Sequence, residues 1–242
     1  MTEHGMIFNA EMVRAILDGL KTQTRREVKL NLDIARLATT YDWATSLAAN
    51  HYQGLAEEQI QQKAESLRGV IHPVILGNGQ MVSIICPHGK PGDRIWVREA
   101  FRVHSRATDV ATLVYKASER NSWTEQTHRV PVAVCNKPAT PEKWTPSLHM
   151  PRWASRILLE ITDVRVERLN AISEEDATAE GVPPAGSLLP DYPGTFLTPK
   201  GDFATAKVAF QRLWESIYGE ESWKANSWVW VISFERIEGG AA

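Results

Sequence analysis

The sequence predicts an α+β protein in which about six strands form one mixed sheet, curled into a barrel and flanked by helices. Apolar and β-branched residues with a period of two predict strands at 157–166 and 228–237. Apolar stripes with helical spacing predict one helix between Asn9 and Gly19 and another at 203–218. Because the helices are inserted between strands without strict alternation, the order favours a curled α+β barrel over a doubly wound sheet.

The first predicted elements are a short strand and the helix after it. Met6–Phe8 has the apolar character of a strand, and Asn9 can cap the helix that follows. One face of that helix carries an apolar stripe, formed by Val13, Ile16, Leu17 and Leu20. Gly19 marks its end, and a polar run from Lys21 to Arg26 follows.

The middle of the chain predicts further strands. Apolar runs on both sides of Gly77-Asn78-Gly79 predict a hairpin between 70 and 85. A turn at Pro91–Asp93 precedes a strand over 94–98, and weaker strand patterns lie at 113–115 and 130–134. Ser173 and Gly181 bracket a short predicted helix as its cap and its terminator.

The length of 242 residues suits one large domain or two small ones. We predict one domain over 1–242, with a helical insertion at about 31–69 and a long loop at about 182–202. The insertion lacks proline, is rich in Ala, Leu, Gln and Glu, and is divided by Gly54 into two predicted helices. The loop is rich in proline and glycine.

Composition excludes several classes of protein. With 43% hydrophobic and 23% charged residues the chain is not mainly disordered. The formal net charge of −2 gives no global basic field for duplex DNA, although a local basic cleft is compatible with it. No run of about 18 apolar residues predicts a membrane span. The N-terminus lacks the pattern of a secretory signal, and two cysteines suit a reducing cytosol, so we expect a cytoplasmic protein.

Neither a metal nor a cofactor is expected. Cys86 and His88 are close together, but no CxxC or HxxxH spacing accompanies them. The sequence also lacks a glycine-rich phosphate loop, a nucleophile elbow and a dinucleotide-binding fingerprint.

Three segments carry candidate functional residues. Lys21, Thr24, Arg25 and Arg26 follow the first helix, where a lysine can complement the helix dipole or contact an anion or nucleotide. In the strand over 94–98, Arg94, Trp96 and Arg98 occupy alternate positions and can line one face of a pocket. Glu180 ends the short helix, where a lone glutamate usually faces solvent.

A tryptophan-rich segment between 144 and 156 adds further candidates. Trp153 can pack in the core or stack on a base, and the same alternatives hold for Trp144. His149 and Arg152 are close enough in sequence to contact a phosphate or a base edge.

Taken together, these segments resemble the ASCH family, the activating-signal-cointegrator homology domain. The motifs are Gly19–Arg26, Lys90–Asp93 with the strand after it, Ser173–Gly181, and the closing Trp228–Phe234. The chain looks most like the larger, tryptophan-rich ASCH proteins of bacteriophages and prophages, whose characteristic segment is similar to Trp144–Arg156.

The resemblance implies a PUA-like β-barrel with a cleft for RNA or nucleosides, in the cytoplasm of a bacterial host. Small bacterial ASCH proteins include N(4)-acetylcytidine amidohydrolases, whose catalytic lysine, threonine and glutamate match Lys21, Thr24 and Glu180. In such chemistry Thr24 supplies a hydroxyl nucleophile, Lys21 a base, and Glu180 a proton shuttle or an orienting group. Burial and nearby arginines would lower the pKa of Lys21, whereas pairing with Glu180 would raise it.

The sequence therefore predicts an amidohydrolase that removes an acyl group from the exocyclic amine of a modified cytidine or related nucleoside. A non-catalytic module that binds RNA or a modified base, and a ribonuclease, remain alternatives. The expected partner is a modified nucleoside or single-stranded RNA, not a membrane, and the oligomeric state is not defined. The predicted substrate-binding residues are Arg25, Arg26, Trp96, Arg98, His149, Arg152 and Trp153.

Overall fold

The computed structural model describes residues 1–30, 32–50, 54–119 and 121–237. Its strands are β1 (Glu3–Ile7), β2 (Gln23–Glu27), β3 (Ile34–Leu37), β4 (His72–Leu76), β5 (Met81–Ile84), β6 (Arg94–Arg98), β7 (Phe101–Arg106), β8 (Val110–Tyr115), β9 (Thr127–Pro131), β10 (Leu158–Arg168), β11 (Phe196–Leu197), β12 (Phe203–Ala204) and β13 (Trp228–Ile237). Its α-helices are α1 (Ala10–Leu17), α2 (Thr40–Asn50), α3 (Glu57–Ser66), α4 (Trp123–Gln126), α5 (Glu174–Ala179), α6 (Ala206–Tyr218) and α7 (Glu220–Lys224).

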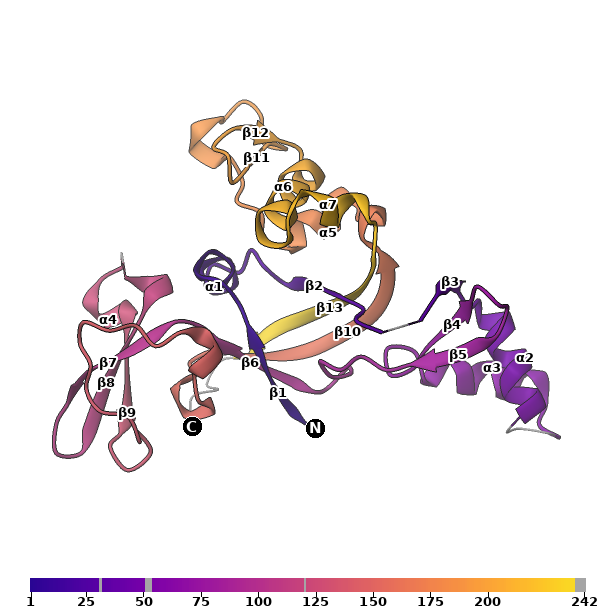
Figure 1. The fold of residues 1–242 in the computed structure, drawn as a ribbon, viewed down its shortest axis with the longest axis horizontal. Helices are drawn as coiled ribbons and strands as arrows, with labels where there is room; N and C mark the ends of the chain where they lie inside the picture. The colour runs from indigo at the N-terminus through magenta and orange to yellow at the C-terminus, as the bar shows by residue number, and fades with distance from the viewer. Residues whose placement is uncertain (31, 51–53, 120, 238–242) are drawn as a thin grey trace.

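A five-stranded mixed sheet forms the centre of the molecule (Figure 1). Its order is β1-β6-β10-β13-β2, with β1 parallel to β6 and the other neighbours antiparallel. The long strands β10 and β13 pair along most of their length, with a bulge between Ile161 and Asp163. The mixed α+β class predicted from the sequence is thus confirmed.

The predicted closure of about six strands into one barrel is not found in the described part of the chain. The central sheet is open, with β1 and β2 as its edges, and the remaining strands form three separate sheets in the orders β3-β4-β5, β7-β8-β9 and β11-β12. Most of these additional strands pair with a sequence neighbour, because a short connection makes local antiparallel pairing the easiest to form. The strand patterns along the chain were therefore informative, but they did not indicate which strands share a sheet.

The insertion at 31–69 contains the two predicted helices, α2 and α3, on either side of Gly54. It also contains the unpredicted strand β3, which pairs with β4 of the predicted hairpin. Insertion and hairpin therefore form one lobe at the right of Figure 1. Residues 31 and 51–53 of the predicted insertion lie outside the described residues.

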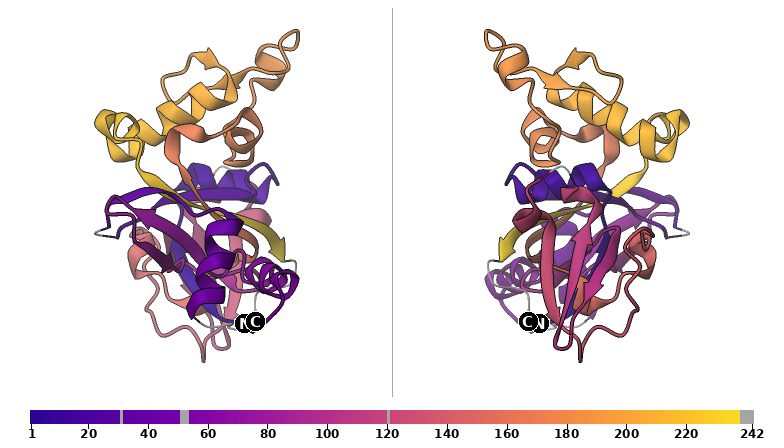
Figure 2. Two further views of the ribbon diagram at one scale, coloured as in Figure 1. Left: turned by 90° about the vertical axis from the view of Figure 1, so that its right-hand side faces the viewer. Right: turned by 90° about the vertical axis from the view of Figure 1, so that its left-hand side faces the viewer.

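Several other elements differ from the prediction in informative ways. The polar run after α1 forms β2, an edge strand that apolar periodicity does not reveal. Strand β7 and the short helix α7 were also not predicted. The loop at 182–202 includes β11, which pairs with β12 just beyond the loop. In Figure 2 this orange segment and α6 stand above the rest of the molecule.

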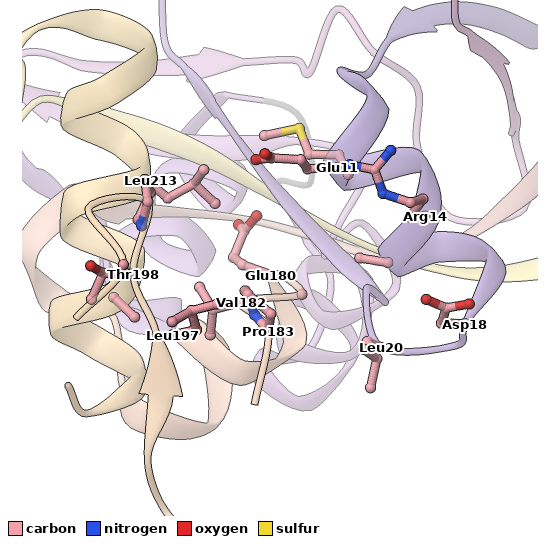
Figure 3. Close-up of a pocket in the computed structure, with 16 residues that line it drawn as sticks. Glu11, Arg14, Asp18, Leu20, Glu180, Val182, Pro183, Leu197, Thr198 and Leu213 are labelled. Atoms are coloured by element: carbon pink, nitrogen blue, oxygen red, sulfur yellow. The ribbon is translucent and has the colours of Figure 1, made fainter. Parts of the chain in front are cut away.

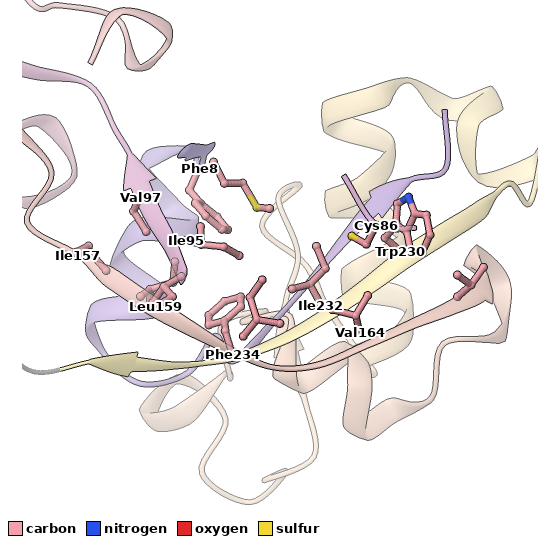
Figure 4. Packing of buried hydrophobic residues seen from close by; sticks show 14 of the residues in the cluster. Phe8, Cys86, Ile95, Val97, Ile157, Leu159, Val164, Trp230, Ile232 and Phe234 are labelled. Atoms are coloured by element: carbon pink, nitrogen blue, oxygen red, sulfur yellow. The ribbon is translucent and has the colours of Figure 1, made fainter. Parts of the chain in front are cut away.

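Strand β13 is buried on both faces, and this places the central sheet between two layers. Trp230, Ile232 and Phe234 pack in the cluster that includes α1, β6 and β10 (Figure 4). Val229 and Val231 pack on the opposite side, against α5, α6 and α7. Trp230 and Ile232 are at most 1% exposed, whereas Trp228 is only partly buried against the same cluster.

Among the described residues, no helix has the length and apolarity needed to cross a bilayer.

Candidate functional site

The candidate site lies where β2 meets the C-terminal end of α5. Lys21 and Glu180 form an isolated antiparallel bridge, and the Thr22 amide donates to the Ala179 carbonyl at 2.9 Å. These backbone contacts join segments that are about 160 residues apart along the chain. They place Lys21 and Glu180 side by side before any side-chain interaction is considered.

Local sequence signals set the ends of the two helices beside the site. The Asn9 side chain accepts a hydrogen bond from the Met12 amide at 2.8 Å and begins α1, as predicted. The Ser173 hydroxyl accepts from the Asp176 amide at 3.1 Å and begins α5. Glu180 is therefore the residue that caps the C-terminal end of a short, well-defined helix.

Gly181 allows the two segments to approach closely. Its φ of +83° lies in the left-handed region, and a Cβ there would stand 2.7 Å from the Lys21 Cβ and 2.9 Å from the Ala15 Cβ. Real side chains do not tolerate such distances without a shift of the backbone. A glycine immediately after Glu180 is thus a requirement of the Lys21–Glu180 contact.

Lys21 and Glu180 form a buried ion pair. The Lys21 Nζ donates to the Glu180 Oε2 at 2.7 Å and to the Glu180 backbone carbonyl at 2.8 Å. Lys21 is 2% exposed and Glu180 3%. Glu180 therefore does not face solvent, contrary to the usual behaviour of a lone glutamate at a helix end.

Arg25 extends this pair into a network of charges. Its guanidinium contacts three carboxylates: Glu180 at 3.3 Å, Glu167 at 3.2 Å and Asp176 at 2.8 Å. Arg165 binds Glu167 and Asp176 from the other side, at 2.6 and 2.8 Å. We call the group Lys21, Arg25, Arg165, Glu167, Asp176 and Glu180 the charge network. The charge network contains three basic and three acidic side chains. Through its ion pairs, Arg25 of β2 holds α5 against β2.

The two opposing influences on Lys21 have a definite outcome in this geometry. Burial is the largest influence and lowers the pKa of Lys21; pairing with Glu180 raises it, and the charges of Arg26 and Arg25 lower it again. The net direction is downward, so Lys21 loses its proton more easily than an ordinary lysine. For Asp176, burial alone would raise the pKa, but Arg165 and Arg25 outweigh burial and hold it below its usual value.

Thr24 lies on the other face of β2 from Arg25. It pairs with Ile232 of β13, whereas Arg25 pairs with Val231. Thr24 and Glu180 both line a narrow gap of about 10 Å³, close to the least volume that admits one water molecule. We call this space the gap; its lining also includes Met12, Arg26, Leu213 and Tyr218. Lys21 contacts Glu180 but is not among the residues that line the gap.

Two larger cavities adjoin the gap through shared lining residues. The α1 cavity, about 490 Å³, shares Met12, Glu180 and Leu213 with the gap. In Figure 3 Glu180 lies in this cavity between residues of α1 and α6. The second cavity, about 340 Å³, shares Arg26 and Tyr218 with the gap. We call the second one the cationic cavity, because Arg26 and Lys29 line it.

Arg26 has a different environment from Arg25. Its guanidinium donates to the Ile7 carbonyl at 2.8 Å and lies over the Phe8 ring at 5.3 Å. Within the described part of the chain Arg26 forms no ion pair, and its buried Nε has no acceptor. Arg26 is therefore the cation at the gap whose charge is not already balanced by a carboxylate.

The other predicted substrate-binding residues do not line the gap or the cavities beside it. Arg98 lies over the Trp96 ring at 5.3 Å and donates to the Ser147 carbonyl at 3.2 Å. Arg152 pairs with Glu3 at 2.6 Å, and Trp153 packs edge-on against Phe101. His149 lines a separate hollow of about 300 Å³ beside β7. The structure thus gathers Lys21, Thr24, Arg25, Arg26 and Glu180, and places Trp96, Arg98, His149, Arg152 and Trp153 elsewhere.

The site residues predicted from the sequence did not include Asp176, Arg165 or Glu167. Arg165 and Glu167 alternate on β10, and Asp176 lies in the acidic first turn of α5. Both patterns were visible in the sequence, but each has an ordinary explanation as a solvated strand face or as favourable charge at a helix start. Only their meeting at Arg25 indicates that they position the site.

Over the described ranges, no group of three or more His, Cys, Asp or Glu side chains is placed to hold a metal ion. Cys86 is buried in the core, and burial raises the pKa of its thiol to about 11. Comparisons with protein family models, with curated proteins and with solved structures yield no match to this chain.

Proposed function

We propose that this protein is an amidohydrolase that removes an acyl group from the exocyclic amine of a modified cytidine or related nucleoside. One observation carries the proposal: Thr24 and Glu180 share a water-sized gap, and the buried amine of Lys21 binds Glu180 at 2.7 Å. A hydroxyl, a carboxylate and an amine are the groups that such a hydrolysis needs. The resemblance to the ASCH family implies the same three residues and a PUA-like fold.

The first chemical step is attack of the Thr24 hydroxyl on the amide carbonyl carbon. The hydroxyl proton passes across the gap to Glu180, either directly or through one water. When Lys21 is neutral and Glu180 ionised, the pair can take up this proton, and Lys21 ends as the ammonium. Burial supports this assignment, because it lowers the pKa of Lys21 despite the neighbouring carboxylate.

Arg26 is the residue suited to stabilise the negative charge that develops on the amide oxygen. It lines the gap, and no described carboxylate neutralises it. Arg25 is unsuited to this task, since Glu167, Asp176 and Glu180 already occupy its guanidinium. A preorganised cation at this place would favour the tetrahedral intermediate over the planar amide.

The remaining steps return the proton and regenerate Thr24. The C–N bond breaks as the Lys21–Glu180 pair delivers the proton to the leaving exocyclic amine, leaving the acyl group as an ester on Thr24. A water molecule then attacks this ester, its proton passing to the same pair and on to the Thr24 oxygen. The products are the unmodified nucleoside and a carboxylic acid, so atoms and charges balance without a cofactor.

The dimensions of the site limit the substrate to a small molecule or an accessible nucleotide. Both adjoining cavities fall within the 300–1,000 Å³ range typical of ligand sites. The gap itself is too small for a base ring. The base therefore occupies one of the two larger cavities, with only its exocyclic end directed at Thr24.

The proposal is tested by incubating the purified protein with N(4)-acetylcytidine and measuring cytidine and acetate. We expect turnover by the unmodified protein and a loss of at least about 100-fold in kcat/KM for Thr24→Val and Glu180→Gln. Lys21→Met should show a similar loss, because the pair can then no longer take up a proton through the amine. Unfolding curves of each variant establish that the fold is retained.

The matched control is Thr178→Val on α5, where the Thr178 hydroxyl donates to the Glu174 carbonyl at an exposed position. This variant should retain full turnover. Activity that survives both Thr24→Val and Lys21→Met would contradict the assigned roles. Salt-sensitive retention of single-stranded RNA without any turnover would instead favour the non-catalytic binding module.

A further inference from the structure

We propose that the cationic cavity binds a phosphate group, so that the substrate is a nucleotide, free or within a strand, rather than an unphosphorylated nucleoside. The inference rests on the proposed function for the reaction at Thr24 and Glu180. It adds which cavity holds the substrate and which chemical class the substrate belongs to.

The charges of the two cavities point to this choice. Arg26, Lys29 and His88 line the cationic cavity together with one acidic residue, Glu27. The α1 cavity has the opposite balance, with Glu11 and Asp18 against Arg14, besides Glu180, which the charge network neutralises. A phosphate would be repelled by the α1 cavity and attracted by the cationic one.

The cations of this cavity lack carboxylate partners among the described residues, although Arg26 also donates to the Ile7 carbonyl. Neither Arg26 nor Lys29 forms an ion pair among the residues the structure describes, and the buried Arg26 Nε lacks an acceptor. An unsatisfied buried donor is unfavourable unless an acceptor arrives from outside. Burial first, and then the charges of Arg26 and His4, lower the pKa of His88 to about 4, so His88 contributes a neutral imidazole and the positive charge comes from Arg26 and Lys29.

The remaining wall of the cavity suits a base. Tyr218 is 45% exposed, and Leu30 and Ile85 present exposed apolar side chains beside it. An aromatic ring next to cations is the usual combination for nucleotides, because stacking holds the base while the cations hold the phosphate. An anion without a ring would leave Tyr218 and the apolar side chains of this wall without a contact.

Continuity with the gap gives the bound nucleotide a defined orientation. Arg26 and Tyr218 line both the gap and the cationic cavity. A base against Tyr218 can therefore direct its exocyclic amide toward Thr24, while the phosphate remains at Lys29. Arg26 lies at the boundary between the two spaces.

The test measures binding of cytidine, cytidine 5′-monophosphate and cytidine 3′-monophosphate by calorimetry at constant ionic strength. We expect at least one monophosphate to bind about tenfold more tightly than cytidine, as one charge-assisted contact would provide. Lys29→Met should remove most of this preference and leave cytidine binding within about twofold. Lys29 is exposed and forms no described ion pair, so its replacement does not endanger folding.

The matched control is Arg14→Met in the α1 cavity, which should leave the preference for the monophosphate unchanged. In parallel, kcat/KM is compared for N(4)-acetylcytidine and its monophosphates, and a short single-stranded RNA containing the modified base separates a free nucleotide from a strand. The preferred monophosphate should be hydrolysed with about tenfold higher kcat/KM.

Equal binding of cytidine and both monophosphates, or a preference that Lys29→Met leaves intact, would overturn the phosphate site. Turnover of N(4)-acetylcytidine under those conditions would leave the proposed function standing. Conversely, a Lys29-dependent preference for a monophosphate without turnover of any acylated form would support the phosphate site and contradict the hydrolase.

Discussion

At the scale of single residues, Arg25 shows how one side chain organises the candidate site. It is 2% exposed and contacts carboxylates from β10 and α5, including Glu180 itself. A buried cation is acceptable only when such partners compensate for its lost hydration. The site therefore depends on a residue that lines the gap beside Glu180 but whose charge is already paired with carboxylates.

Replacing Arg25 by methionine should destabilise the protein by about 3–5 kcal/mol, because the partially buried carboxylates of the charge network would lose their common partner. Urea unfolding at neutral pH measures the effect. The control is Arg36→Met, which removes an exposed pair with Asp42 and should cost less than about 1 kcal/mol. Equal losses in the two variants would show that the charge network does not hold α5 in place.

At the scale of elements, the junction of β2 with α5 depends on two glycines that play different parts. Gly19 follows α1 with a φ of +73° and has open space where a Cβ would stand. Gly181 has a similar φ of +83°, but a Cβ there would meet both Lys21 and Ala15. Both positions need left-handed backbone, whereas only Gly181 also needs the absence of a side chain.

This difference predicts unequal effects of alanine. Gly19→Ala should cost roughly 1–2 kcal/mol, the strain of a left-handed residue with a Cβ. Gly181→Ala should cost about 1–3 kcal/mol more, because the added methyl forces α5 away from β2. Unfolding curves compare the two, and kcat/KM with N(4)-acetylcytidine should fall only for Gly181→Ala. Similar unfolding curves would argue against the close approach of Gly181 to Lys21.

At the scale of the whole molecule, smaller lobes surround one open sheet, and β13 links the packing on its two faces. Folding buries imidazoles in this arrangement, and burial lowers the pKa of His72 and His88 below 6.5. Above pH 6.5 both imidazoles are mostly neutral in the folded protein and in the unfolded chain. Below it the unfolded chain binds protons that the folded protein does not, so stability falls as the pH decreases.

We therefore expect the free energy of unfolding to decline between about pH 6.5 and pH 4, where His88 begins to protonate in the folded state as well. His88→Gln should flatten part of this decline, and urea unfolding at several pH values measures it. His149→Gln, at an exposed position, is the matched control. A decline that His88→Gln leaves unchanged would place the acid sensitivity in other groups.

Local sequence signals were sufficient to predict many of the helices and strands. The cap at Asn9, the cap at Ser173 and the hairpin over 72–84 follow from turn and capping chemistry within a few residues. Strands β10 and β13 follow from their apolar patterns. Strand β2 was missed because its pairing with β13 supplies the stabilisation that its own polar side chains do not indicate.

The sequence by itself determined the α+β class, most helix ends and the chemical types of the candidate residues, because these depend on local backbone preferences and on side-chain identity. Only the tertiary structure decided that the sheet stays open, that Lys21 meets Glu180, and that Arg25 holds both. The reason is physical: pairing across about 160 residues and the balance of burial against charge depend on which surfaces pack together, and no short stretch of sequence encodes that.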